Sequence, residues 1–129
     1  MTGQPRPIRV ILDASAIRDF THGSVHVGET LAEVADDSGA AGLPILCLAQ
    51  ARWAITDTDR LDLLVNHHAT TLLAPDPEDW QALAATYDIV GRLDAAAAVL
   101  AAIDHDCDVL TAQPGLYGGL AGGGPVIPI

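Results

Sequence analysis

The sequence predicts an α/β protein with a central parallel sheet of four to five strands covered by helices in a three-layer α/β/α arrangement. The chain has 129 residues, about the size of one ordinary domain, and half of them are hydrophobic, which is enough to form a core. Short β-branched runs alternate along the chain with longer segments of helix-forming residues. We therefore expect a single domain over residues 1–129.

The first half of the chain contains two predicted strands. Residues 8–12 form a β-branched run that ends at Asp13, and a helix is expected to begin directly after it. A second helix should end near Ser38 and Gly39. The apolar residues 43–48 are expected to form the next strand, with Pro44 near its beginning, and residues 49–55 the helix that follows.

The second half repeats this alternation. Helices are expected over residues 59–66 and 78–87, with a short strand over 70–73 between them. The alanine-rich segment after Asp94 has the composition of a helix buried on most sides. Residues 108–111 should form a strand, residues 115–124 a flexible Gly-rich closing loop, and residues 125–129 an edge strand.

Composition limits the kinds of function and location that we expect. Six basic residues against 17 acidic ones give a formal net charge of −11, which disfavours nonspecific binding of nucleic acid. Such acidity suits a bound divalent metal, a basic protein partner, or solubility alone. The sequence shows no targeting segment or membrane span, and two isolated cysteines form no disulfide framework, so we expect a cytoplasmic protein with both thiols reduced.

Three polar residues are expected near the carboxyl ends of strands, where α/β sheets bind their ligands. They are Asp13, Gln50 and Gln113. Asp94 would join them at the start of the central helix. Helix capping alone also explains an Asp at either helix start, but it does not require both residues to lie at the same edge of a sheet.

Four segments, in their order and spacing, resemble the signature segments of PIN domains, most closely the VapC-type toxin branch. The resemblance covers nearly the whole chain and is carried by VILDASAI, LPILCLAQARWAI, GRLDAAAAVLAA and DVLTAQP. It implies a metal-dependent ribonuclease fold in which four acidic residues hold Mg²⁺ or Mn²⁺, and the metal activates water to attack an RNA phosphodiester.

The resemblance assigns part of that acidic site to this chain. Asp13 matches the first acid and Asp94 the third, and Ser15 matches the hydroxyl that commonly supports the first. Gln50 stands where the second acid is expected, and Gln113 where the fourth is expected. Losing two of four charges removes much of the attraction for a hard divalent ion, so we expect Asp13 and Asp94 to bind metal weakly or not at all.

Other residues offer alternatives around this pocket. A carboxylate from elsewhere, of which Asp19 is the nearest in sequence, could complete the metal site. Arg52 or Arg92 could instead pair with a retained Asp and occupy the metal position. The five histidines have no spacing typical of a zinc site.

Three functions remain open from the sequence. We favour a catalytically impaired interaction module derived from a metal-dependent ribonuclease, which would bind a basic antitoxin-like or regulatory protein or form a homodimer. The alternative is an active endoribonuclease of the VapC type that uses Mg²⁺ or Mn²⁺ and binds RNA. A small-molecule-binding α/β domain is the third.

Overall fold

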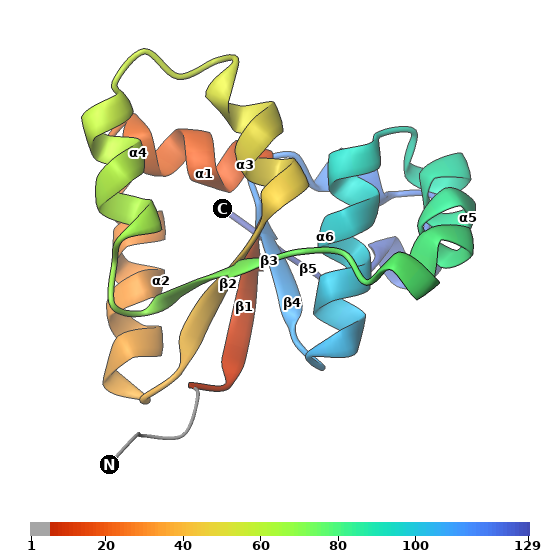
Figure 1. Ribbon diagram of the computed structural model, residues 1–129, viewed down its shortest axis with the longest axis horizontal. Coiled ribbons are helices and arrows are strands. Elements are labelled where there is room, and N and C mark those ends of the chain that lie inside the picture. Colours follow the sequence, from red (N-terminus) through yellow and green to blue (C-terminus); the bar gives the residue numbers. More distant parts are fainter. Residues whose placement is uncertain (1–5) are drawn as a thin grey trace.

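The computed structural model describes residues 6–129 as one five-stranded sheet in which all strands are parallel. The order across the sheet is β3-β2-β1-β4-β5 (Figure 1). The strands are β1 Ile8–Leu12, β2 Ala40–Pro44, β3 Thr70–Leu73, β4 Asp108–Thr111 and β5 Val126–Pro128. The predicted three-layer α/β/α architecture with a parallel sheet is confirmed.

Helices cover both faces of the sheet (Figure 1). On one side lie α1 Ala14–Thr21, α2 Val25–Asp36 and α4 Thr58–Val65, and on the other lie α5 Trp80–Val90 and α6 Leu93–Asp104. The remaining helix, α3 Ile45–Arg52, follows β2 directly and contacts both α1 and α6. None of the helices in residues 6–129 is long and apolar enough to cross a membrane.

The core lies around the central strands β1 and β4. Ile11, Leu12 and Val109 are fully buried, as expected for parallel strands with helices on both faces. The helix α6 packs against β1, β2 and β4, and its buried side chains are mostly alanines. Small side chains let the helix approach the sheet closely, so the predicted buried central helix is confirmed.

One predicted strand is wrong, because residues 43–48 do not form a single strand. The strand β2 ends at Pro44, and Ile45 begins α3. A short apolar run cannot be assigned to strand or helix from its pattern alone. Here Pro44 ends the strand, since it has no N–H to donate to a ladder and its φ of −61° suits the start of a helix. The predicted helix over residues 49–55 therefore begins four residues earlier.

The Gly-rich segment after β4 also differs from the expected flexible loop. It forms two 3₁₀ turns, Pro114–Tyr117 and Ala121–Gly123, before the predicted edge strand β5. Gly122, Gly123 and Gly124 all have positive φ, which glycine adopts without steric cost. These turns place Tyr117 in the core with no exposed surface.

Candidate functional site

The candidate site lies where the sheet changes its direction of winding. The chain moves from β1 to β2 and β3 toward one edge, then crosses to β4 and β5 at the other edge. The carboxyl ends of the adjacent strands β1 and β4 therefore form the crevice in which α/β sheets bind ligands. Asp13 follows β1 directly, and its backbone N–H donates to the Leu110 carbonyl of β4.

Asp13 is buried, with 2% of its surface exposed, and both oxygens of its carboxylate accept hydrogen bonds from the chain. One oxygen, Oδ1, accepts from the Ser15 hydroxyl at 2.6 Å and from the Ala16 backbone N–H at 3.0 Å. The other, Oδ2, accepts from the Tyr117 hydroxyl at 2.7 Å. The Ala16 bond makes Asp13 the N-cap of α1, so the structural role considered from sequence is present.

Ser15 connects the end of β1 to the end of β4. Its hydroxyl donates to Asp13 and accepts from the Ala112 backbone N–H at 2.8 Å. It also lies 3.3 Å from the Thr111 hydroxyl, which accepts from the Gln113 backbone N–H at 2.9 Å. Ser15 and Thr111 are both buried, so this network fixes the distance between the carboxyl ends of β1 and β4.

Tyr117 is a site residue that the sequence analysis missed. It lies 104 positions after Asp13, inside a segment read as a closing loop. Burial, together with the negative charge of Asp13 and the hydrogen bond to it, raises the pKa of the phenol far above its ordinary value. The hydroxyl therefore remains protonated and acts as a donor. A lone aromatic residue within a glycine-rich run was the one local signal for this position.

Asp94 is also buried, and Arg92 pairs with it. The guanidinium Nε donates to Oδ1 and Nη2 donates to Oδ2, each at 3.1 Å, which is a bidentate pair. Asp94 is not the cap of α6, because Arg92 occupies the N-cap position and Asp94 lies in the first turn. Of the two arginine pairings considered from the sequence, that of Arg92 with Asp94 is present. The Arg52 guanidinium donates to the Ile55 carbonyl instead.

Cys47 lies between the two acidic positions. Its thiol donates to the Asp94 backbone carbonyl at 3.2 Å, and the side chain is fully buried. Burial raises the pKa of the thiol well above its ordinary value, and the negative charges of Asp13 and Asp94 raise it further. The predicted core position of Cys47 is confirmed, and the thiol stays neutral.

The two glutamines are exposed, whereas the two aspartates of the candidate site are buried. Gln50 does not directly follow β2 as expected but lies near the end of α3, with its side chain exposed. It lines an open pocket of about 300 Å³ with Asp94 and Arg92, and Trp53 and Tyr87 contribute to the same pocket. Gln113 is exposed beyond β4, and its backbone N–H, not its side chain, joins the network described above.

The side chains present do not fit a divalent metal as they are arranged. Both aspartates have their oxygens occupied by donors of the same chain. In residues 6–129, no group of three or more His, Cys, Asp or Glu side chains is placed to hold a metal ion. Relocation of another carboxylate into the pocket, considered from the sequence, therefore has no support within that part of the chain.

The fold resembles that of a solved protein from Pyrobaculum aerophilum. The crystal structure of PAE2754 matches with a TM-score of 0.63 and 14% sequence identity, over 93% of this chain and 83% of that one. At this identity the likeness shows a shared fold alone. No family model matches the sequence, and no curated protein matches it.

Proposed function

We propose that this chain is a PIN-like protein with a degenerate active site, which acts as an interaction module and has lost most or all ribonuclease activity. The observation that carries the proposal is the internal pairing of both retained carboxylates. Tyr117 and Ser15 engage Asp13, and Arg92 engages both oxygens of Asp94. Metal binding would have to break these bonds with two fewer charges to attract the ion.

The formal charge of the whole chain agrees with this proposal. A net charge of −11 repels the phosphates of RNA unless cations intervene. The same charge favours a basic protein as partner, since complementary potentials speed association and select the partner. These features favour a cytoplasmic interaction module with a basic protein as its partner. The homodimer also expected from the sequence gains nothing from this charge, because two copies of an acidic chain repel each other.

The test compares the parent with a variant in which the two expected acids are restored. Gln50→Glu with Gln113→Asp returns both carboxylates, and Gln81→Glu with Asn66→Asp adds the same charge at exposed positions away from the site. Mn²⁺ binding is measured by calorimetry, and cleavage of a generic RNA is followed in parallel. We expect no micromolar Mn²⁺ site and no cleavage in the parent or in the control.

Two results would overturn the proposal. One is RNA cleavage by the parent that disappears in Asp13→Asn, which would make the chain an active metal-dependent endoribonuclease. The other is a micromolar Mn²⁺ dissociation constant for the parent. Activity that appears only in the restored variant, or in the restored variant combined with Arg92→Gln, would support a site that lost its charge but kept its geometry.

A further inference from the structure

A second surface feature lies between α6, the starts of α3 and α5, and the end of β3, and Asp13 and Asp94 do not line it. It is a groove of about 90 Å³ whose floor is apolar and includes Leu73, Leu83 and Leu100. A volume of that order holds several water molecules, so the groove can receive a large side chain but not a whole helix. Asp94 lies at the first turn of α6, whereas the groove is lined by α6 from Ala97 to its last turn, so the carboxylates of the two features belong to opposite ends of the helix. Leu46 of α3 lines both the groove and the pocket beside Asp94.

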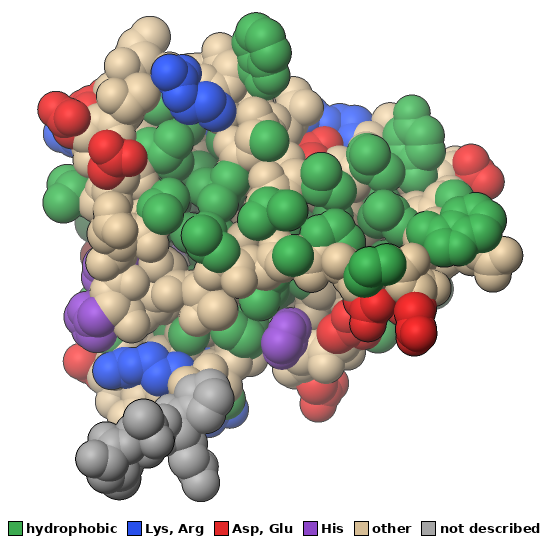
Figure 2. Space-filling model, viewed as in Figure 1, with side chains coloured by type: hydrophobic (Ala, Val, Ile, Leu, Met, Phe, Trp, Pro, Cys, Tyr) green, Lys and Arg blue, Asp and Glu red, His purple; other side chains and the backbone are tan. Residues whose placement is uncertain are grey.

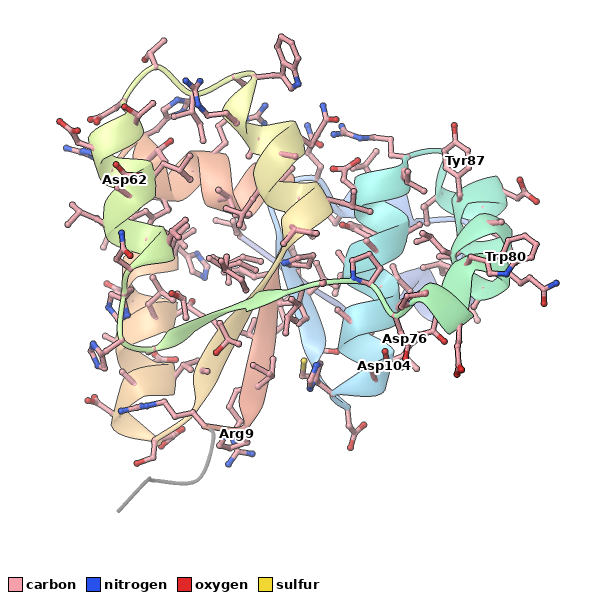
Figure 3. The ribbon with its side chains drawn as sticks, in the orientation of Figure 1. Arg9, Asp62, Asp76, Trp80, Tyr87 and Asp104 are labelled. Atoms are coloured by element: carbon pink, nitrogen blue, oxygen red, sulfur yellow. The ribbon has the colours of Figure 1, made fainter. Side chains whose placement is uncertain are left out.

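Three carboxylates line the groove. They belong to Asp76 and Asp79 before α5 and to Asp104 at the end of α6. Figure 3 shows Asp76 and Asp104 facing each other where these two elements approach. Within residues 6–129 none of the three forms an ion pair, and His105 is the only basic side chain that lines the groove with them.

Apolar side chains extend from the groove across the neighbouring helices. Figure 2 shows them gathered over α3, α6 and α5, with acidic side chains along one edge of the patch. Trp80 is 65% exposed, and Ile45, Leu72 and Ile103 are exposed as well. A contiguous apolar surface with a polar rim marks an interaction site more often than it marks ordinary surface.

We propose that this groove, hereafter the acidic groove, binds a basic amphipathic helix of another protein. An apolar side chain of that helix would enter the groove, and Lys or Arg side chains one turn away would reach Asp76, Asp79 and Asp104. Charge complementarity selects this occupant. A second copy of the chain would bring another −11 charge and another set of carboxylates toward the same face, which electrostatic repulsion opposes.

This inference specifies the surface through which the proposed interaction module acts. It depends on residues that the metal and RNA experiments do not alter. A parent that cleaves RNA would end the first proposal and leave the acidic groove untouched, whereas loss of peptide binding would leave the degenerate site as proposed.

The test uses two fluorescent peptides of about 15 residues, long enough to form a helix. Both carry the same stripe of Leu at helical spacing, and the polar positions are Lys in one and Glu in the other. Binding to the full chain is measured by fluorescence anisotropy at low and at high salt. We expect the Lys peptide to bind at least about tenfold more tightly than the Glu peptide, with a difference that shrinks at high salt.

Two matched variants locate the binding site. Asp76→Asn, Asp79→Asn and Asp104→Asn together remove three charges from the acidic groove, and Asn keeps the cap that Asp76 provides to the Glu78 backbone N–H. Asp36→Asn, Asp37→Asn and Asp62→Asn remove three exposed charges elsewhere. The first set should weaken binding of the Lys peptide by about tenfold, as expected for the loss of three ion pairs at the surface. The second set should weaken binding by less than about twofold.

A further variant tests the apolar floor. Leu83→Glu should abolish binding of the Lys peptide, and circular dichroism with thermal unfolding checks that the variant is folded. Equal losses in the two Asp→Asn sets would attribute binding to net charge alone and overturn the proposal. The absence of Lys-peptide binding would also overturn the proposal. So would a dimer that the parent forms in sedimentation experiments and Leu83→Glu does not, because a second copy would then occupy the acidic groove.

Discussion

The two ends of α6 carry carboxylates in opposite situations. At its first turn Asp94 is buried and paired with Arg92, and nearby Asp13 accepts hydrogen bonds from Tyr117, Ser15 and a backbone N–H. At its last turn Asp104 is exposed and, together with Asp76 and Asp79, has no ion-pair partner in residues 6–129. One end satisfies its charge internally, and the other presents it to solvent.

This difference shows why acidic residues cannot be counted as ligands from composition alone. A buried carboxylate must be bonded by its own chain or by a ligand, because an unpaired buried charge is very costly. In the candidate site the chain itself supplies those bonds. The exposed carboxylates remain hydrated at little cost and stay available to a partner.

The strongest test of the comparison is removal of the Asp13 carboxylate. Asp13→Ala deletes the cap of α1 and leaves the buried Tyr117 hydroxyl without its acceptor. We expect the free energy of unfolding to fall by about 3 kcal/mol, the sum of a lost cap and an unsatisfied buried group. Urea denaturation of the parent and the variant measures this loss.

The exposed carboxylate at the other end of α6 is the control. Asp104→Ala should change the free energy of unfolding by no more than about 0.5 kcal/mol, as is usual for surface substitutions. Equal effects of the two substitutions would mean that the bonds to Asp13 contribute nothing special to the fold. Asp13→Asn, which keeps a capping oxygen, should fall between them.

Removing the donor instead of the acceptor has a smaller effect. Tyr117→Phe keeps the buried ring and deletes the hydroxyl that donates to Asp13. We expect a loss of about 1.5 kcal/mol, the scale of a hydrogen bond to a charged group. Tyr87→Phe, at a tyrosine that is 46% exposed, should be nearly neutral in the same urea titration. A neutral Tyr117→Phe would show that packing alone holds the Gly-rich segment.

The two ion pairs within residues 6–129 allow a matched comparison. The Arg92–Asp94 pair involves a buried carboxylate, whereas both members of the Arg60–Asp57 pair are about half exposed. Arg92→Gln should therefore cost about 1 kcal/mol and Arg60→Gln less than about 0.5 kcal/mol. Thermal unfolding at two salt concentrations measures both, and salt should weaken only the Arg60 effect. The reverse ranking would contradict the assignment of Arg92 as the partner of a buried charge.

The smallest expected effect is a pH dependence from His67. Burial and the neighbouring His68 lower the pKa of this imidazole below its usual 6.5, and its Nδ1 accepts from the Ala69 backbone N–H. As the pH falls below that value the unfolded chain takes up the proton first, so the free energy of unfolding decreases. The measurement is stability between pH 7.5 and about 5, and His67→Asn should flatten the curve.

Much of the fold followed from local pattern. The strands 8–12, 70–73 and 108–111 and the helix after Asp94 were predicted because β-branched runs and alanine-rich runs have different local preferences. The prediction of a strand over 43–48 failed because a short, continuous apolar run shows neither the helical nor the strand periodicity. The prediction of a flexible loop over the Gly-rich segment failed because its order depends on contacts with distant elements, namely the burial of Tyr117 in the core and its hydrogen bond to Asp13.

The sequence by itself determined the alternation of strands and helices, and with it the placement of Asp13 and Asp94 near the carboxyl ends of the sheet. Only the tertiary structure decided what those residues do. It brought Tyr117 to Asp13 across 104 positions, placed Cys47 beside Asp94, and joined Asp76, Asp79 and Asp104 around one groove. The local pattern of apolar and polar residues predicts how each segment can bury its apolar side. The pairing of distant polar groups depends instead on how the layers of helices and strands pack together.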